Sequence, residues 1–330
     1  MILAGDIGGT NTRLALFEME DKCPRVIVER TFASREHKSL DEIVRQFLGE
    51  NGSTITRACI GVAGPIRNRK SKPSNLSWVV DAEHLATLFG FDGVTLVNDL
   101  EANALGLVAL EAKDFFVLNE GVPDLEGNNA IISAGTGLGE VGLHFEGKMR
   151  RPFASEGGHS DFAPRNELEI ELLRYLLRQF HHVSYERVLS GPGLFNVYKF
   201  LRDTRRGEEP AWLADQMQDA DPSAVITRAA LAGESELCMR ALDLFVSIFG
   251  AEAGNLALKV NATAGFFLGG GIAPRIIEEL KGPTFMEAFT AKGRMRALLK
   301  AVPVRVILND MTALLGAAIC ASSAELKESR

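Results

Sequence analysis

The chain has 330 residues, of which 46% are hydrophobic and 24% charged, and its formal net charge is -7. This length allows two compact domains or one large one. The acidic balance disfavours a general surface for nucleic acids or anionic membranes, so we expect neither nucleic acid nor membrane as a partner. The four cysteines lie far apart without a CxxC pair. This disfavours a structural zinc site or a disulfide framework and suits a reducing cytoplasm.

The N-terminal third predicts strands first, then alternating helices and strands. Three alternating segments predict an antiparallel meander: 1–6, 12–18 and 25–32. Further strands are expected at 57–64 and 93–99, and helices at 39–50, 81–90 and 100–110. Ser39 and Asp81 are suitable N-caps for the first two helices, and Gly90 is a suitable end for the second. The alternation indicates a mixed or parallel sheet.

The remaining elements form a helix-rich block followed by strands and a final helix. Residues 166–180 place leucines on one helical face, and the longest predicted helix runs from about Glu234 to Val260. Polar residues interrupt its apolar part, which predicts a buried helix rather than a membrane span. Strands at 265–271 and 304–310 and a helix at 312–326 follow.

Three motifs occur twice in the same order, which predicts a duplicated α/β unit. The pairs are GDIGGTNTRLAL with SAGTGLGEVGLHF, IGVAGP with LGGGIAP, and LVNDLEANALG with ILNDMTALLGA. The second copy carries the helical block, about residues 160–260, as an insertion. A duplicated unit gives two lobes that face each other across a cleft, which is a natural place for a ligand.

The tip of the first hairpin has the residue types that a phosphate site needs. Gly8 and Gly9 let backbone N–H groups approach an anion, and Thr10 adds a hydroxyl donor. Asp6 would repel phosphate unless a cation lies between them, which indicates a bridge through hydrated Mg²⁺. The second hairpin tip, 135–137, offers similar donors. The alternative is two ordinary tight hairpins, for which the glycines alone suffice.

The spacing Gly137-x-Gly139-x-x-Gly142 matches a dinucleotide-binding fingerprint, but the pattern around it does not. Such a site needs a helix after the glycines, whereas EVGLHFEGK keeps the alternation of a strand. We therefore expect no dinucleotide site there.

The chain resembles the bacterial glucokinase family, the branch of the hexokinase/actin-like superfamily without a zinc site. The resemblance spans nearly the whole chain and rests on GDIGGTNTRLAL, LVNDLEANA, GTGLG, SEGGHSDFAP, ERVLSGPGL and GGGIAPR. The related repressor-and-kinase family carries a cysteine-rich zinc motif after its glycine-histidine segment. Here the segment GGHSDFAPRNELE contains no cysteine.

This resemblance implies a duplicated, two-lobed α/β fold of the actin-like/ribonuclease H-like, hexokinase type with a central cleft. It implies a small domain of 1–110 with 301–330, and a large domain of 111–300 that contains the helical insertion. The implied activity is ATP-dependent phosphorylation of glucose at the 6-hydroxyl in the cytoplasm, with Mg²⁺. Family members often form homodimers, so a homodimer is expected here on the resemblance alone.

The resemblance also implies roles for individual residues. Asp99 corresponds to the catalytic base, and it contacts the sugar. The other implied sugar ligands are Asn98, Glu156, His159 and Glu186. The implied ATP-binding residues form three groups: Gly5, Asp6, Ile7, Gly8, Gly9 and Thr10; Gly135, Thr136 and Gly137; and Gly269, Gly270 and Gly271 near the adenosine.

Two questions stay open at this point. The dipeptide Asn-Asp occurs at 98–99 and again at 309–310, and spacing alone allows either aspartate to be the base. The family pattern favours Asp99 and leaves Asp310 as a structural residue or a helix cap. The alternatives for function are an ATP-dependent kinase of another hexose and an actin-like ATP-binding module without sugar turnover.

Overall fold

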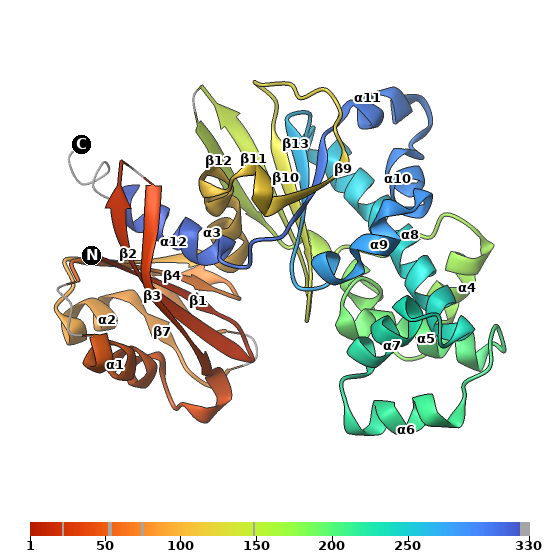
Figure 1. Ribbon diagram of the computed structural model, residues 1–330, viewed down its shortest axis with the longest axis horizontal. Coiled ribbons are helices and arrows are strands. Elements are labelled where there is room, and N and C mark those ends of the chain that lie inside the picture. The colour runs from red at the N-terminus through yellow and green to blue at the C-terminus, as the bar shows by residue number, and fades with distance from the viewer. Residues whose placement is uncertain (22, 52–54, 74–75, 148, 324–330) are drawn as a thin grey trace. The chain divides into compact units, whose positions relative to one another are not determined.

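The computed structural model describes residues 1–21, 23–51, 55–73, 76–147 and 149–323. The chain divides into two compact units, each built on its own sheet (Figure 1). The units comprise, first, Met1–Asp114, Pro152–Ala154 and Asn309–Arg330 and, second, Phe115–Arg151 and Ser155–Leu308. The domain limits expected from the sequence, 1–110 with 301–330 and 111–300, stay a prediction, apart from the strand at 304–307 that is described below.

The first unit contains a five-stranded sheet in the order β3-β2-β1-β4-β8. Its strands are β1 (Ile2–Ile7), β2 (Asn11–Glu20), β3 (Cys23–Ala33), β4 (Arg57–Val62) and β8 (Gly93–Asn98). β1, β2 and β3 form the predicted antiparallel meander, and β4 and β8 run parallel to β1. A small antiparallel sheet that the sequence did not predict consists of β5 (Ile66–Arg67), β6 (Lys70–Ser71) and β7 (Val80–Asp81).

Helices cover both faces of the first sheet (Figure 1). They are α1 (Leu40–Asn51), α2 (Ala82–Phe89), α3 (Asp99–Gly106) and α12 (Thr312–Ser323). α1 and α2 pack in one apolar core, and α12 packs in a second core against Ile2, Ala4 and Phe17. Asp81 caps α2, and Gly90 ends it at a positive φ of 70°, as predicted. The last predicted residues of the final helix, 324–326, lie outside the described residues.

The second unit contains a six-stranded sheet in the order β12-β11-β10-β13-β14-β9. Its strands are β9 (Phe115–Asn119), β10 (Asn129–Ala134), β11 (Leu138–Glu146), β12 (Met149–Ser155), β13 (Gly265–Gly269) and β14 (Val304–Ile307). β10 and β11 form an antiparallel hairpin, and β13 runs parallel to β10. The segment after Gly137 is therefore a strand, so the helix that a dinucleotide fingerprint requires is replaced by β11.

The position of β14 corrects one expectation. The small domain expected from the sequence, 1–110 with 301–330, includes the last strand, but β14 pairs with β13 in parallel and with β9 in antiparallel orientation in the second unit. β9 was not predicted, and it provides a neighbour for the outer edge of β14. Only the helix that follows, α12, belongs to the first unit.

The duplication predicted from the repeated motifs is confirmed by the topology. The order β2-β1-β4-β8 in the first sheet has its counterpart in β11-β10-β13-β14 in the second. In each copy an antiparallel hairpin is followed by two parallel strands. Helix α3 follows β8 as helix α12 follows β14.

The helices of the second unit are organised around one long buried helix. The helices are α4 (Glu167–Leu176), α5 (Gly191–Asp203), α6 (Ala211–Asp219), α7 (Pro222–Leu231), α8 (Glu236–Val260), α9 (Ile277–Lys281), α10 (Pro283–Thr290) and α11 (Arg296–Ala301). α8 is long and apolar enough to cross a membrane by length and composition, but most of it is buried inside the unit. This confirms the predicted core helix.

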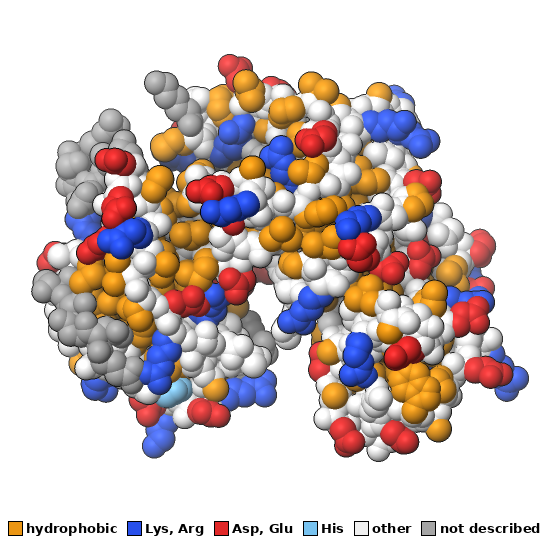
Figure 2. Space-filling view, viewed as in Figure 1, with side chains coloured by type: hydrophobic (Ala, Val, Ile, Leu, Met, Phe, Trp, Pro, Cys, Tyr) orange, Lys and Arg blue, Asp and Glu red, His pale blue; other side chains and the backbone are white. Residues whose placement is uncertain are grey.

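Charged side chains of both signs are mixed on the surface. On the face drawn in Figure 2, Asp and Glu side chains alternate with Lys and Arg side chains over both units. The described residues on this face form no large area in which all the charged side chains are basic. This distribution agrees with the net charge of -7.

Candidate active site

The first predicted phosphate-binding tip is a tight turn that Ser34 holds in place. Gly8, Gly9 and Thr10 join β1 to β2. The Gly8 N–H donates a hydrogen bond to the Asn11 carbonyl at 2.9 Å, and the Ser34 hydroxyl donates to the Gly8 carbonyl at 2.9 Å. Thr10 is exposed, and both glycines are half-buried. The turn therefore holds its own backbone and the Thr10 hydroxyl group in a fixed position.

Two residues predicted for the same ATP site lie inside the first unit. A Cβ atom on Gly5 would lie 2.7 Å from Ile60 Cδ1 and 3.0 Å from Leu14 Cδ2, so Gly5 is needed for packing. The Ile7 side chain is fully buried in the core. Contact of either residue with a nucleotide is therefore restricted to backbone atoms.

Asp6 lies where β1 meets its two neighbours, opposite Arg13 of β2 and Gly61 of β4. Burial and, to a smaller extent, the Asp99 carboxylate raise the pKa of Asp6 to about 6, and Arg13 opposes them. The two carboxylates are thus close enough to repel each other. A cation near them would favour the ionised form of both.

Asn98 and Asp99 lie at the junction between β8 and α3. The Asn98 side-chain oxygen accepts a hydrogen bond from the Leu100 N–H at 2.9 Å, and Glu101 accepts one from the Asn98 N–H at 3.2 Å. This is a capping box, which is a structural role for Asn98. Asp99 Oδ1 also accepts from the Leu100 N–H, at 3.0 Å, and Asp99 is half-buried.

Small residues that the sequence analysis did not single out allow α3 to approach β4 and α12. A Cβ atom on Gly61 would lie 3.3 Å from Ala102 Cβ. A Cβ atom on Gly106 would collide with the Thr312 carbonyl, and one on Gly316 would collide with the Ala102 carbonyl. The close packing fixes the start of α3 at the carboxyl ends of β1 and β4.

The second Asn-Asp pair has a different environment. Asn309 accepts a hydrogen bond from the Met311 N–H at 2.9 Å and so resembles Asn98 in its capping role. Asp310 is 84% exposed, and its carboxylate lies 3.6 Å from the Arg13 guanidinium, which also binds Glu29. The Asp310 carbonyl accepts a further hydrogen bond from Arg13 at 2.6 Å. Asp310 is therefore far more exposed than Asp99, and its contacts are with Arg13.

The second predicted phosphate-binding tip joins β10 to β11. The Gly135 N–H donates to the Gly137 carbonyl at 2.9 Å, and the Gly135 carbonyl accepts from the Gly191 N–H at 2.8 Å. Thr136 is exposed, and a Cβ atom on Gly135 would meet open space. A Cβ atom on Gly137 would lie 2.6 Å from Glu186 Oε2. The tip and Glu186 are therefore in direct contact.

Glu186 belongs to a short 3₁₀ turn, Tyr185–Arg187, and its carboxylate is half-buried. Its Oε2 accepts a hydrogen bond from the Leu138 N–H at 3.0 Å, and its carbonyl accepts from the Ser190 hydroxyl at 2.7 Å. Glu186, a predicted sugar ligand, is thus hydrogen-bonded to the hairpin whose tip contains the predicted ATP ligands Gly135, Thr136 and Gly137.

Glu156 precedes another 3₁₀ turn, Gly157–His159, and His159 is the last residue of that turn. Their side chains are 76% and 60% exposed, and Glu156 Oε2 lies 3.9 Å from His159 Nε2. Both side chains are therefore accessible to a ligand, whereas polar side chains buried in the core are not.

The two glycines of this turn are required by its packing on β11. A Cβ atom on Gly157 would collide with the Glu140 carboxylate, and one on Gly158 would collide with the Leu138 carbonyl. Any larger residue would lift the turn away from the strand. The glycines of SEGGH therefore set the height of Glu156 and His159 above the sheet.

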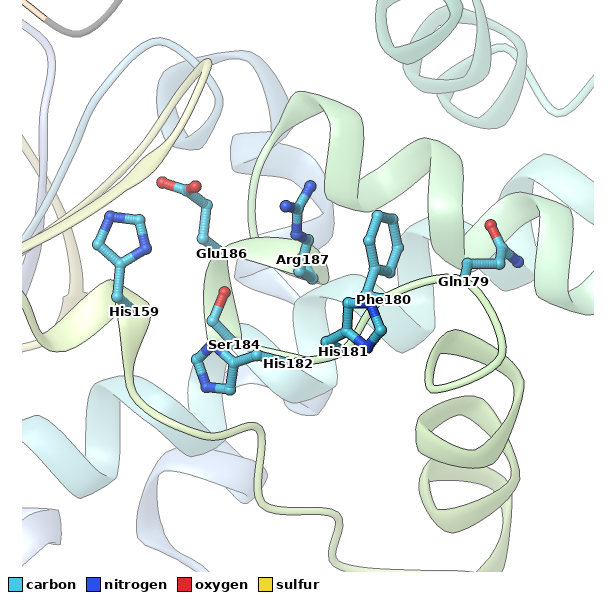
Figure 3. Close-up of a pocket in the computed structure, with 8 residues that line it drawn as sticks. All are labelled: His159, Gln179, Phe180, His181, His182, Ser184, Glu186 and Arg187. Carbon is cyan, nitrogen blue, oxygen red and sulfur yellow. The ribbon is translucent and has the colours of Figure 1, made fainter.

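A cavity of about 380 Å³ in the second unit brings the two turns together (Figure 3). In Figure 3 the Glu186 carboxylate lies beside the His159 ring. The lining residues are His159, Gln179, Phe180, His181, His182, Ser184, Glu186 and Arg187. Histidines 181 and 182 follow α4, and His182 Nε2 is 2.8 Å from Asp161 Oδ1.

The predicted adenosine segment contains three glycines with different environments. Gly269 is buried, and its Cβ would lie 3.4 Å from Ser133 Oγ. Gly270 has a positive φ of 78°, and a Cβ atom there would collide with the Ala134 carbonyl. A Cβ atom on Gly271 would meet open space. Gly270 and Gly271 are both exposed, so the backbone of these two is open to a ligand.

The described residues include no group of three or more His, Cys, Asp or Glu side chains that could hold a metal ion. A cation at Asp6 would therefore take most of its ligands from water and from a bound phosphate group. Mg²⁺ commonly binds proteins in this way.

The chain matches known proteins over nearly its whole length. The glucokinase family model matches residues 3–324. The glucokinase of Trichormus variabilis is 41% identical over 338 residues, covering 98% of this chain and 99% of that protein. A glucokinase structure from an Antarctic psychrotroph has a TM-score of 0.85 at 33% identity, with 98% of both chains covered. A ROK family glucokinase from Streptomyces griseus, in complex with glucose and AMPPNP, has a TM-score of 0.67 at 20% identity, with 98% and 99% covered. The fold is the duplicated α/β fold of hexokinase-type sugar kinases.

Proposed function

Because this chain belongs to the glucokinase family, we infer that it transfers the γ-phosphoryl group of ATP to the 6-hydroxyl group of glucose. The observation that carries this inference is the match to curated glucokinases over nearly the full length of both chains. The residue roles below are proposals that the site geometry supports.

We propose that Asp99 is the catalytic base. It lies at the carboxyl end of β8, beside Asp6 and at the start of α3. The transition state of phosphoryl transfer is loose, so a base acts mainly by orienting the hydroxyl and accepting its proton late. One half-buried carboxylate is sufficient for this task. The ion pair of Asp310 with Arg13 disfavours Asp310 for the role.

We propose that the two glycine-rich tips bind the phosphates of ATP. The Gly8 and Gly135 N–H groups are engaged within their own turns, so these glycines shape the tips, and the proposed donors are Gly9 and Thr10 in one tip and Thr136 and Gly137 in the other. Asp6 would hold Mg²⁺ through water, and the ion would offset the negative charge of the phosphates. The open backbone at Gly271 is where we expect the adenosine to approach.

We propose that Asn98, Glu156, His159 and Glu186 read the sugar. Glucose is neutral and covered with hydroxyls, so each carboxylate needs a matched hydroxyl or water. The oxygen of Asn98 already accepts in the capping box, so its amide nitrogen is the group available to donate to a sugar. Glu186 is in contact with the hairpin tip, which would couple recognition of the sugar to the position of the phosphates.

Release of ADP, measured with and without glucose and over a panel of hexoses, tests the function. We expect glucose-dependent release with glucose as the preferred sugar. Preference for mannose or an N-acylated sugar would identify a kinase of another hexose. Slow ATP hydrolysis that no sugar accelerates would instead identify an actin-like nucleotide-binding module.

We propose a cytoplasmic homodimer, on the family resemblance alone. Sedimentation of the purified chain at micromolar concentration measures this directly. A single species with the mass of one chain, 35.8 kDa, would contradict the proposal.

A further inference from the structure

Two buried glutamates lie beneath the sugar-binding turn of the second unit. Glu140 of β11 is 1% exposed, and Glu252 of α8 is fully buried. The two side chains hydrogen-bond to each other. Glu252 also accepts hydrogen bonds from Asn255 Nδ2 at 2.7 Å and from Lys259 Nζ at 3.0 Å. Buried carboxyls are costly unless they are paired, so a pair in an apolar core calls for an explanation.

The pair contacts both segments that carry the proposed sugar carboxylates. The backbone of Gly157, next to Glu156, lies against the Glu140 carboxylate so closely that a Cβ atom would collide with it. The hydroxyl of Tyr185, next to Glu186, accepts a hydrogen bond from Asn255 Nδ2 at 3.1 Å, and the same nitrogen donates to Glu252, so Asn255 joins Tyr185 to Glu252.

The charges around the pair favour one shared proton. The charged groups that face Glu140 are Glu252 and Lys259, both from α8. Burial and the Glu252 carboxylate raise the pKa of Glu140 to about 8, and Lys259 opposes them. At neutral pH Glu140 therefore holds a proton that it can donate to Glu252, as in other carboxyl pairs that share a proton.

Folding stability alone does not account for this arrangement. Glu140 Oε1 is buried and has no hydrogen-bond partner within the part of the chain that the structure describes. An unsatisfied buried oxygen destabilises a fold. On the other side of the network, Lys292 donates to Asn255 at 2.5 Å and to the Ala251 carbonyl at 2.8 Å. The network therefore connects the buried helix α8 to both turns, Gly157–His159 and Tyr185–Arg187.

We propose that Glu140 and Glu252 are positioning residues that fix the turns bearing Glu156 and Glu186 at the spacing that glucose requires. This proposal rests on the sugar-binding role proposed above. Neither glutamate needs to touch the sugar, because one supports Gly157 and the other holds Tyr185 through Asn255. A displacement of about 1 Å in either turn is enough to cost up to about 10²-fold in catalysis.

Three variants and steady-state kinetics test the proposal. We expect Glu140→Leu to raise the KM for glucose by about 10-fold or more, with the KM for ATP changed by less than about 2-fold. Glu140→Gln keeps the size and the hydrogen bond to Glu252, so it should retain glucose affinity. The matched control is Ser235→Ala, which removes the N-cap of α8 at the end far from Glu252. It should lower thermal stability without changing the KM for glucose.

The pH dependence separates positioning from a merely structural role. In the wild type, kcat/KM for glucose should fall above about pH 8, where Glu140 loses its proton beside Glu252. In Glu140→Gln this fall should be absent, because the amide does not titrate. This readout remains available if Glu140→Leu does not fold.

Two results would overturn the proposal for different reasons. An unchanged KM for glucose in Glu140→Leu, with Glu186→Gln raising it, would show that the sugar site is correct but the buried pair does not position it. An unchanged KM for glucose in Glu186→Gln as well would show that the sugar site itself is misplaced.

Discussion

Replacement of Asp6 with asparagine should stabilise the protein while it disables the enzyme. The folded protein raises the pKa of Asp6 from 3.8 to about 6, mainly by burial and then through Asp99. A carboxyl with a higher pKa in the folded state holds its proton more tightly there, so its ionisation destabilises the fold once the pH exceeds the unfolded value. The difference, at about 1.4 kcal/mol per pKa unit, corresponds to about 3 kcal/mol above pH 6.

Urea unfolding without nucleotide measures this effect. At pH 8 we expect Asp6→Asn to be about 3 kcal/mol more stable than the wild type, and at pH 5 about half of that, because Asp6 is then largely protonated in the fold. The matched control Asp219→Asn changes an exposed aspartate at the end of α6 and should shift stability by less than about 0.5 kcal/mol. An equal gain at both pH values, or no gain at pH 8, would refute the reasoning.

Three further predictions concern the proposed ligands. Asp99→Asn should lower kcat by at least ~10²-fold and affect glucose binding less; loss of turnover in Asp310→Asn but not in Asp99→Asn would identify the second repeat as the source of the base. Gly8→Val and Gly9→Val should weaken MgATP binding in nucleotide titrations, because a β-branched side chain fills space that the phosphates need; unchanged affinity in both would move the phosphate site elsewhere. Glu186→Gln should reduce the preference in kcat/KM for glucose over its deoxy analogues more than it alters the KM for ATP. The preference is worth about 1–3 kcal/mol for each acceptor left unpaired. Equal kcat/KM for all these sugars in the wild type would exclude a sugar-reading role.

The duplicated fold could be predicted because its signals are local. Glycines at 8–9 and 135–137 mark the hairpin tips, and alternating apolar residues mark the strands on either side. The caps at Asp81 and Asn98 act within three residues of their own positions. Signals of this range can be recognised in a sequence and then matched between the two repeats.

Features that depend on distant partners could not be predicted. The apolar segment 304–307 fits either sheet, and only pairing with β13 and β9 decides between them. Glu252 could be recognised as an interruption of an apolar helix, but its partner Glu140 lies in another element of the same core. Likewise, the need for glycine at position 5 arises from Ile60, far along the chain.

The location of α12 affects how the protein is made. One face of the first sheet, including Ile2 and Phe17, is covered by Leu314, Ala317 and Ala321 of α12. These helix residues leave the ribosome about 300 residues after the strands they cover, which is a delay of roughly 15 to 60 seconds at about 5 to 20 residues per second. The second unit is complete only with β14, a few residues before α12, so neither unit is finished until the end of synthesis. The N-terminal sheet must wait with an apolar face exposed, and nascent chains that stop before residue 312 should depend on chaperones to remain soluble.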